Sequence, residues 1–411
     1  MAAIPISVIV VSRHRPELLR RCLTAIGQLD HDRFETVVVA CPRGAQVARS
    51  MGFAKVCDFD TANISVARNL GVSRASGDVL AFVDDDAVPE PTWLAHLADV
   101  FDDPAVVQAG GITLGRNGIS VQHGATRVDA MGKSHAAAVS GTDPVVLASE
   151  GDRYPRLHGT NMAIRRQALA DHGGFDPRFA FYLDETDLSL RIARAGGATM
   201  FVPKAIVHHA SGASAFRDAD RTPRQVAEIA ASAAVFHRKH CAAALWCEAR
   251  QGFLEDRKAW LVGHMHRGTL APDVAARLIR ELAEGYAEGL TRTEVEGLRL
   301  SDAEDAIPEC RAAGRKDLYL VRRRATGNRV FETAKALVQA GNRVTVFDLR
   351  PDARYHRVAF TDDGFWLHRG GIFGREVREE PLFQKATREE RIRTTLARIA
   401  GIRSKNPLFR A

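Results

Sequence analysis

The sequence lacks the cysteine patterns that mark disulfide frameworks or zinc sites. Its six cysteines are scattered, and none forms a C-x-x-C pair. No charged and then apolar leader precedes the first expected strand, so we expect a reducing, cytoplasmic location. The longest apolar runs, such as Ile6–Val11 and Val79–Val83, fall far short of the ~20 residues that a membrane-spanning helix requires. We therefore expect a chain that is soluble, or at most peripheral to a membrane.

Internal repeats and low-complexity tracts are missing as well. Hydrophobic residues make up 45% of the 411 residues and charged residues 26%, which excludes a disordered or fibrous protein. This length predicts two or three domains. The net charge of +7 suits an anionic partner, whether a nucleotide, a phosphorylated glycan, a nucleic acid or a membrane surface, and charge alone does not choose among them.

The first half of the chain alternates short β-branched runs with helical patterns. This alternation predicts an α/β fold with a mostly parallel central sheet. We expect strands at 6–11, 36–39, 56–58 and 78–83, with helices at 16–29 and 64–75. Open α/β sheets bind ligands at the carboxyl ends of their strands, so the residues that follow these strands are the first candidates for a site.

The pattern of residues along the chain changes after about residue 224. Ala-rich helical sequence continues to about residue 300, and a smaller α/β pattern follows, with strands at 317–321 and 344–347, a helix at 330–340, and a hairpin of 357–360 with 365–368. We therefore predict a catalytic α/β domain at 1–223, a helical segment at 224–310 and a carboxyl-terminal α/β region at 311–411.

Three consecutive aspartates follow the apolar run 78–83. Like charges repel, and the end of a strand needs no carboxylates, so a structural role explains Asp84, Asp85 and Asp86 poorly. Carboxylate oxygens suit Mg²⁺ or Mn²⁺, and strand alternation directs Asp84 and Asp86 to one side and Asp85 to the other. From these residues alone, a metal site and a solvated loop with a helix cap are both open interpretations.

The segments around this run occur in a specific order. They are Ile64–Gly71, Ala75–Asp86, Pro89–Leu94, Gly159–Arg166, Gly173–Asp176, Asp184–Arg191 and His209–Ser214. Together they resemble the core signature of family 2 glycosyltransferases with the GT-A fold, over roughly residues 4–216. This resemblance implies inverting transfer of a sugar from a nucleotide-diphosphate donor with the help of Mn²⁺ or Mg²⁺. It also implies a glycan or lipid-linked acceptor and no nucleic-acid partner.

The resemblance also implies roles for individual residues. Asp86 and His209 match the metal ligands, with His208 as an alternative to His209. Ser12, Arg68, Asp84 and Asp85 match the nucleotide and donor side. The family usually carries an aspartate after its second long strand, whereas this chain has Ala40-Cys41-Pro42 there. Uridine, thymidine and guanosine diphosphates therefore all stay open as donors.

The acceptor side is implied by Gly159, Asn161 and the acidic cluster that contains Asp187. An acceptor hydroxyl needs a carboxylate base, and repulsion among neighbouring acids should raise the pKa of at least one of them. Position in the motif selects Glu185 as the base, with Asp184 as its competitor. Asp187 is expected to orient the site or to cap the helix that runs through Arg191.

Two other functions stay open at this stage. A nucleotidyltransferase or another nucleotide-sugar enzyme would use a similar scaffold, but a nucleotidyltransferase has no need of a base on the acceptor side. A catalytically silent module of surface-polysaccharide assembly would lack slow donor hydrolysis. The absence of a Gln-x-x-Arg-Trp motif favours addition of a single sugar. The Arg322–Arg324 run and the basic tail leave peripheral contact with anionic lipid as a further alternative, and nothing in the sequence predicts the oligomeric state.

Overall fold

The computed structural model describes residues 3–210, 212–298, 307, 315–323, 325, 327–404 and 409–410. Its central sheet has the strand order β10-β13-β6-β12-β4-β1-β2-β3, with β5 paired to β13 and β7 paired to β6. These strands are β1 (Ile6–Ser12), β2 (Phe34–Ala40), β3 (Ala54–Asp58), β4 (Val79–Asp84), β5 (Ala87–Pro89), β6 (Val106–Leu114), β7 (Val121–His123), β10 (Val145–Val146), β12 (Met162–Arg165) and β13 (Ala198–His209).

Helices pack on this sheet through regularly spaced apolar residues. In the first helix, Leu19, Cys22, Leu23 and Ile26 are buried together, as their spacing predicts, and Pro16 starts the helix without costing a hydrogen bond. The helices are α1 (Pro16–Ile26), α2 (Pro42–Met51), α3 (Ile64–Ser73), α4 (Trp93–Val100), α5 (Arg166–Asp171) and α6 (Asp184–Arg194). α2 is not among the helices expected from the sequence, although it too begins with a proline.

Strand direction confirms the predicted α/β class with its mostly parallel sheet. β1 is parallel to β2 and β4, β2 to β3, and β6 to β13, whereas β12 runs antiparallel to β4 and β6, and β10 antiparallel to β13. The chain moves outward from β1 through β2 to β3 and then returns to place β4 on the other side of β1. The strand order therefore reverses between β1 and β4, where open α/β sheets bind their ligands.

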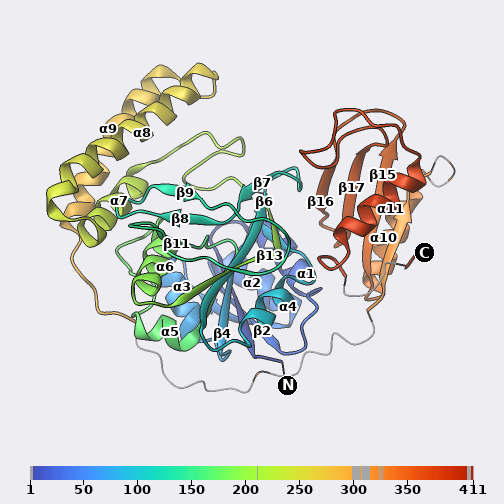
Figure 1. Cartoon of the computed structure of the whole chain (residues 1–411), viewed down its shortest axis with the longest axis horizontal. Helices are drawn as coiled ribbons and strands as arrows, with labels where there is room; N and C mark the ends of the chain where they lie inside the picture. Colours follow the sequence, from blue (N-terminus) through green and yellow to red (C-terminus); the bar gives the residue numbers. More distant parts are fainter. Residues whose placement is uncertain are drawn as a thin grey trace.

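A helical layer follows the sheet, made of α7 (Ala227–His240), the short η1 (Ala243–Leu245), α8 (Trp246–His266) and α9 (Pro272–Thr291). α7 and α9 approach closely because Gly285 and Gly289 lie against the backbone of Ala227 and Ala231, where a Cβ atom would collide. α7 shares one apolar cluster with Leu190 of α6 and with Phe179 and Leu183 in the segment before it. Figure 1 shows α8 and α9 side by side, projecting away from the sheet.

A smaller three-stranded sheet, β11-β8-β9, lies near this layer, made of β8 (Thr126–Val128), β9 (Ser134–Ala136) and β11 (Tyr154–Arg156). Within the described ranges, no helix combines the length and the apolar composition needed to cross a membrane.

The carboxyl-terminal unit, residues 315–404 with 409–410, contains a five-stranded sheet of order β16-β17-β15-β14-β18. Its elements are β14 (Asp317–Val321), α10 (Arg329–Gln339), β15 (Arg343–Arg350), β16 (Arg357–Phe360), β17 (Trp366–Gly371), α11 (Arg388–Ile399) and β18 (Phe409–Arg410). The parallel β14–β15 pair and the antiparallel β16–β17 hairpin confirm the predicted elements. The predicted boundary between residues 310 and 311 lies outside the described residues, and the three-domain division stays a prediction.

A buried ion pair joins the carboxyl-terminal unit to the central sheet. Arg403 donates to both carboxylate oxygens of Glu90, at 2.9 and 2.6 Å, and Glu90 follows β5. The Arg403 guanidinium also stacks over Trp366, 4.1 Å from the ring centroid, and both partners of the ion pair are almost completely buried. Burial alone would raise the pKa of Glu90, but Arg403 and His208 lower it to about 2, so this carboxylate is charged.

Loss of this pair should destabilise the docked unit. In Arg403→Gln, Glu90 remains as a buried charge without its main partner, and we expect the free energy of unfolding to fall by about 3–5 kcal/mol in urea denaturation. Arg21→Gln is the matched control, because Arg21 pairs with Asp362 between the same two parts of the chain but the side chains are 30% and 77% exposed. Its expected cost is below about 1 kcal/mol, and equal losses in the two variants would contradict this account.

Candidate functional site

A pocket of about 500 Å³ lies at the carboxyl ends of β1, β2 and β4. Its lining includes Ser12 at the end of β1, Arg13 after it, Asp84 at the end of β4, and Asn63 before α3. Asn63 caps α3 by accepting a hydrogen bond from the Val66 amide. The pocket therefore occupies the point at which the strand order reverses, and it is large enough for a nucleotide.

The three aspartates separate as strand alternation predicts. Asp85 is fully buried and faces Ser12, whose hydroxyl donates to its carboxylate at 2.6 Å. Arg15 makes an ion pair with Asp85 at 2.5 Å and reaches Asp86 at 3.1 Å. Burial raises the pKa of Asp85 to about 7, although Arg15 opposes the shift.

One group of metal-ligand type is found among the residues that the structure describes. It contains Asp84, Asp86 and His209, whose ligand atoms all lie within 4.8 Å of one another. His209 Nε2 lies 3.1 Å from a carboxylate oxygen of Asp86, and the other oxygen accepts a hydrogen bond from the Gly212 amide at 2.7 Å. Burial alone would raise the pKa of Asp86, but His209 and Arg15 lower it below its usual range. Two carboxylates with an imidazole suit Mn²⁺ or Mg²⁺.

The two adjacent histidines of β13 point in opposite directions. His208 Nε2 lies 2.8 Å from Glu90 and its ring packs near Trp366, in the contact with the carboxyl-terminal unit. His208 is therefore away from Asp86, and the alternative that placed it among the metal ligands is wrong. His209 is the histidine that joins the acidic group.

Arg68 connects the donor side to the acidic pair of α6. Its guanidinium pairs with Asp184 and lies 3.4 Å from Asp84, while its flat face packs over Phe175 and Phe82. Its side chain is only 5% exposed. The Arg68 guanidinium, which the sequence assigned to the donor, is therefore already paired with carboxylates of the protein in the described structure.

Glu185 differs from Asp184 in its surroundings. The Asp184 side chain is 3% exposed and that of Glu185 14%, with Arg156 lying 3.5 Å from Glu185. Burial and the charge of Glu185 raise the pKa of Asp184 to about 8, against the effect of Arg68. Burial alone would also raise the pKa of Glu185, but Arg156 and Arg68 lower it. Glu185 is therefore the acid of this pair that is ionised at neutral pH and reaches solvent.

The backbone immediately before these acids is strained. Tyr182 and Leu183 both have positive φ angles, 79° and 65°, which non-glycine residues rarely adopt. Leu183 is also the residue before the first turn of α6. Strain of this kind collects at functional sites, where surrounding packing enforces it, and it is invisible in the sequence.

Two residues that were predicted on the acceptor side make their contacts with other residues of the protein. The Asn161 amide donates to the carbonyls of Ile112 and Ala205 and accepts from the Trp93 indole, so it joins β6, β13 and α4. Gly159 lies directly against the Arg68 guanidinium, where a Cβ atom would collide. Asn161 therefore holds the sheet together, and Gly159 makes room for Arg68.

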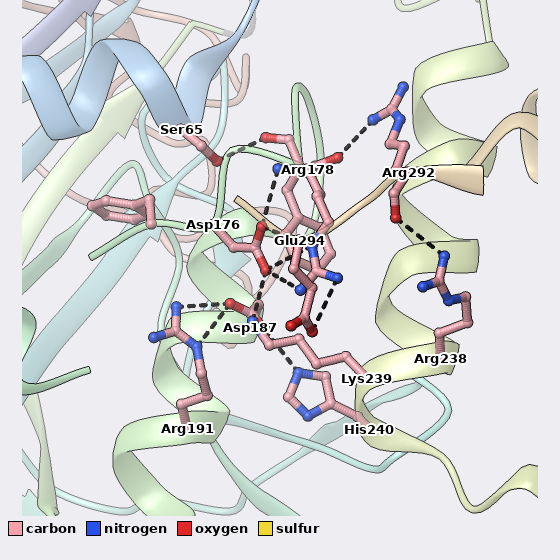
Figure 2. Close-up of polar contacts among 12 residues, drawn as sticks. Ser65, Asp176, Arg178, Asp187, Arg191, Arg238, Lys239, His240, Arg292 and Glu294 are labelled. Carbon is pink, nitrogen blue, oxygen red and sulfur yellow. Dashed lines mark hydrogen bonds and ion pairs between the residues drawn. The ribbon is translucent and has the colours of Figure 1, made fainter. Parts of the chain in front are cut away.

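Asp187 is the centre of a buried charge network. Figure 2 shows its carboxylate between Arg191 on the same helix and His240 of α7. Lys239 reaches both Asp187 and Asp176 at 2.8 Å. Burial alone would raise the pKa of Asp187, but Arg191, His240 and Lys239 lower it below its usual range. Asp187 therefore faces α7. Its contacts with α7 hold α6, and with it the acidic pair, in position.

Sequence reasoning missed several residues at this site. Arg15 had a visible signal, because two arginines, Arg13 and Arg15, follow directly after the first strand. Gln122 and His123 of β7 had none. Gln122 Nε2 lies 3.0 Å from His209 Nδ1, and His123 stacks on His158 at 4.1 Å between centroids. Burial and Arg156 lower the pKa of His123 to about 4, so this imidazole is neutral.

Comparison with known proteins gives one family. Residues 3–227, just over half of the 411 residues, match the family described as "Glycosyltransferase like family 2". The matched segment contains the pocket, the acidic group with His209, and the acidic pair of α6.

Two curated relatives are each 26% identical to this chain, and only over part of its length. Glucosyl-dolichyl phosphate glucuronosyltransferase of Haloferax volcanii is 26% identical over 121 residues, which cover 29% of this chain and 36% of the relative. Pre-mycofactocin glycosyltransferase of Mycobacterium tuberculosis is 26% identical over 213 residues, covering 50% and 42%. The chain thus spans less than half the length of these curated relatives. Among solved structures, the mannosyltransferase PcManGT from Pyrobaculum calidifontis in complex with GDP-Man and Mn²⁺ aligns with a TM-score of 0.42 at 16% identity, covering 72% of this chain and 89% of that one.

The network around Asp187 predicts a pH-dependent stability. The lowered pKa means that Asp187 stabilises the fold above the pKa of an unfolded aspartate, about 4, and that this stabilisation is lost as the pH falls toward the folded value. Asp187→Asn should therefore lower the free energy of unfolding by about 3–5 kcal/mol near neutral pH, with the difference from the parent shrinking below about pH 4. Urea denaturation across this range measures it.

Glu294→Gln is the control for this prediction, because Glu294 joins the same network through Arg178 but is 85% exposed. It should change stability little at any pH. A loss in Asp187→Asn that stays constant as the pH falls would contradict the assignment.

Proposed function

Because the chain belongs to the glycosyltransferase-like family 2, we propose that it transfers a single sugar from a nucleotide-diphosphate donor to an acceptor hydroxyl, with inversion at the anomeric carbon. The observation that carries the proposal is the position of Arg68. One buried guanidinium contacts Asp84, which lines the nucleotide-sized pocket, and Asp184, which neighbours the candidate base. The donor and the base would therefore meet in one cleft, as direct displacement requires. Synthesis of a glycoconjugate or polysaccharide in the cytoplasm, or at the inner face of the membrane, is the setting that fits this reaction.

In the proposed reaction the acceptor oxygen attacks the anomeric carbon from the face opposite the nucleoside diphosphate. The new carbon–oxygen bond forms as the bond to the phosphate oxygen breaks, and the hydroxyl proton passes to Glu185. Glu185 suits this role because it is ionised and partly exposed. Asp184 is closed off by Arg68, so it is the weaker candidate.

A divalent cation, Mn²⁺ or Mg²⁺, fits the group of Asp84, Asp86 and His209. When bound there, it would act as a Lewis acid on the oxygens of the departing diphosphate. The ionised Asp86 and the imidazole of His209 would hold it, and Asp84 would complete the set from the pocket side. The ion pair between Asp85 and Arg15 would hold the backbone next to Asp86 in position.

The adjacent histidines give a test of the metal site. His209→Gln should lower the affinity for Mn²⁺, measured by calorimetry with a nucleoside diphosphate present, by at least about tenfold. His208→Gln should leave this affinity unchanged, because His208 faces Glu90. Equal Mn²⁺ affinities in the parent and in His209→Gln would show that the group does not hold the metal.

Replacing the base tests the reaction itself. Glu185→Gln keeps the size of the side chain but cannot accept the proton, so we expect kcat to fall by roughly 10²–10⁴ while nucleotide affinity changes little. The parent should lose activity as the pH falls through the pKa of Glu185, because the ionised form is needed, and the variant should lack this limb of the profile.

Asp184→Asn is the comparison for this variant. A large loss in Asp184→Asn with near-normal turnover in Glu185→Gln would move the role of base to Asp184. If both variants turn over at the parental rate with saturating substrates, the acidic pair is structural and the inverting mechanism loses its main support.

A further inference from the structure

A second cavity, of about 570 Å³, opens beside His209. One side comes from the segment that matches the family, including His123, His209 and Arg217. The other side comes from α8 and the turn after it, through Trp260 and Arg267. α8 lies beyond residue 227, where the family match ends, so this wall lies outside the matched segment.

A stacked pair of rings separates this cavity from the nucleotide-sized pocket. Phe181 and Phe216 lie 3.9 Å apart between centroids, with an angle of 7° between their planes. Both residues line both cavities. The candidate metal group lies at the same partition, because Asp84 lines the pocket and His209 lines the second cavity. The second cavity thus borders the candidate metal group on its His209 side, whereas the nucleotide-sized pocket borders it on its Asp84 side.

The second cavity is basic. Its lining includes Arg217, Arg221 and Arg267, against Asp220 as the acid of the lining. The Asp220 carboxylate accepts a hydrogen bond from the Thr222 amide in its own turn. Arg221 has a φ of 73°, so this turn holds a non-glycine residue in the left-handed region and fixes where its side chain starts. Burial and the charges of Arg116 and Arg217 lower the pKa of Arg221, so these cations repel one another.

We propose that this cavity binds the acceptor through a phosphate or diphosphate group that the acceptor carries, with Arg221 and Arg267 as its ligands. The inference rests on the proposed transfer, because it assigns the acceptor half of the same cleft. Guanidinium groups bind phosphate oxygens in a bidentate manner, which matches a cluster of arginines better than an uncharged glycan does. Trp260 and the two stacked phenylalanines offer apolar faces for the sugar or isoprenoid part next to the phosphate.

Calorimetry on the full chain tests this assignment. The donor pocket is first saturated with Mn²⁺ and whichever of UDP, dTDP and GDP binds, and the heat of this step is recorded. Glucose 1-phosphate or farnesyl diphosphate is then added, each compared with its uncharged counterpart, methyl glucoside or farnesol, in the same detergent. The first probe represents a water-soluble acceptor and the second a lipid-linked one, and tighter binding of either charged probe than of its counterpart supports the proposal.

Variants locate the binding. Arg267→Gln should weaken the charged probe about tenfold, as expected for loss of a charge-assisted hydrogen bond, and Arg221→Gln gives a second reading. Lys258→Gln removes a charge from an exposed position of α8, the helix that Arg267 follows, outside the cavity lining, and should leave the affinity unchanged.

The assignment would be overturned by equal binding of the charged and uncharged probes or by equal effects of Arg267→Gln and Lys258→Gln. Displacement of the nucleotide by the probe would also overturn it, because it would place the anion in the donor pocket. Nucleotide heat without probe heat would overturn this inference alone, whereas the absence of nucleotide heat would remove the proposed transfer as well.

Discussion

The candidate site depends on burying many carboxylates next to one another without leaving their charges unbalanced. An isolated ionised carboxylate is expensive to bury, so each acid needs a cation within direct reach. Arg68 serves Asp184 and Asp84, and Arg15 serves Asp85 and Asp86. Burial still raises the pKa of Asp85 and Asp184, whereas Arg15 helps to lower the pKa of Asp86 and Arg68 helps to lower that of Glu185. A cleft that can hold a cation and a base together follows from this balance.

The same rule joins the parts of the chain that surround the site. Asp187 ties α6 to α7 through Lys239 and His240, and Glu90 ties the end of β5 to the carboxyl-terminal unit through Arg403. Glu90 also binds His208, the neighbour of His209. The carboxyl-terminal unit therefore contacts the strand that carries the candidate metal ligand, which gives it a part in holding the site.

The sequence predicted the elements whose signals are local. Continuous apolar runs predicted β1 and β4, helical spacing predicted α1, and a turn sequence between two short strands predicted the β16–β17 hairpin. Strand alternation separated Asp85 from Asp84 and Asp86. The sequence could not show the roles of residues whose neighbours come from distant segments. Asn161 looks like a polar site residue in the motif, but its amide joins three elements of the fold. Arg156 and the strained Tyr182 gave no signal, because their roles arise only when the sheet and α6 meet.

The central claim is that Glu185 and the donor pocket act on opposite faces of one anomeric carbon. The stereochemistry of the product tests this claim most directly. Proton NMR of the transferred sugar, taken early in the reaction, reports its anomeric configuration from the coupling of the anomeric proton. The account predicts a configuration opposite to that of the donor, so an α-linked donor gives a β-linked product. A product that keeps the configuration of the donor would contradict it.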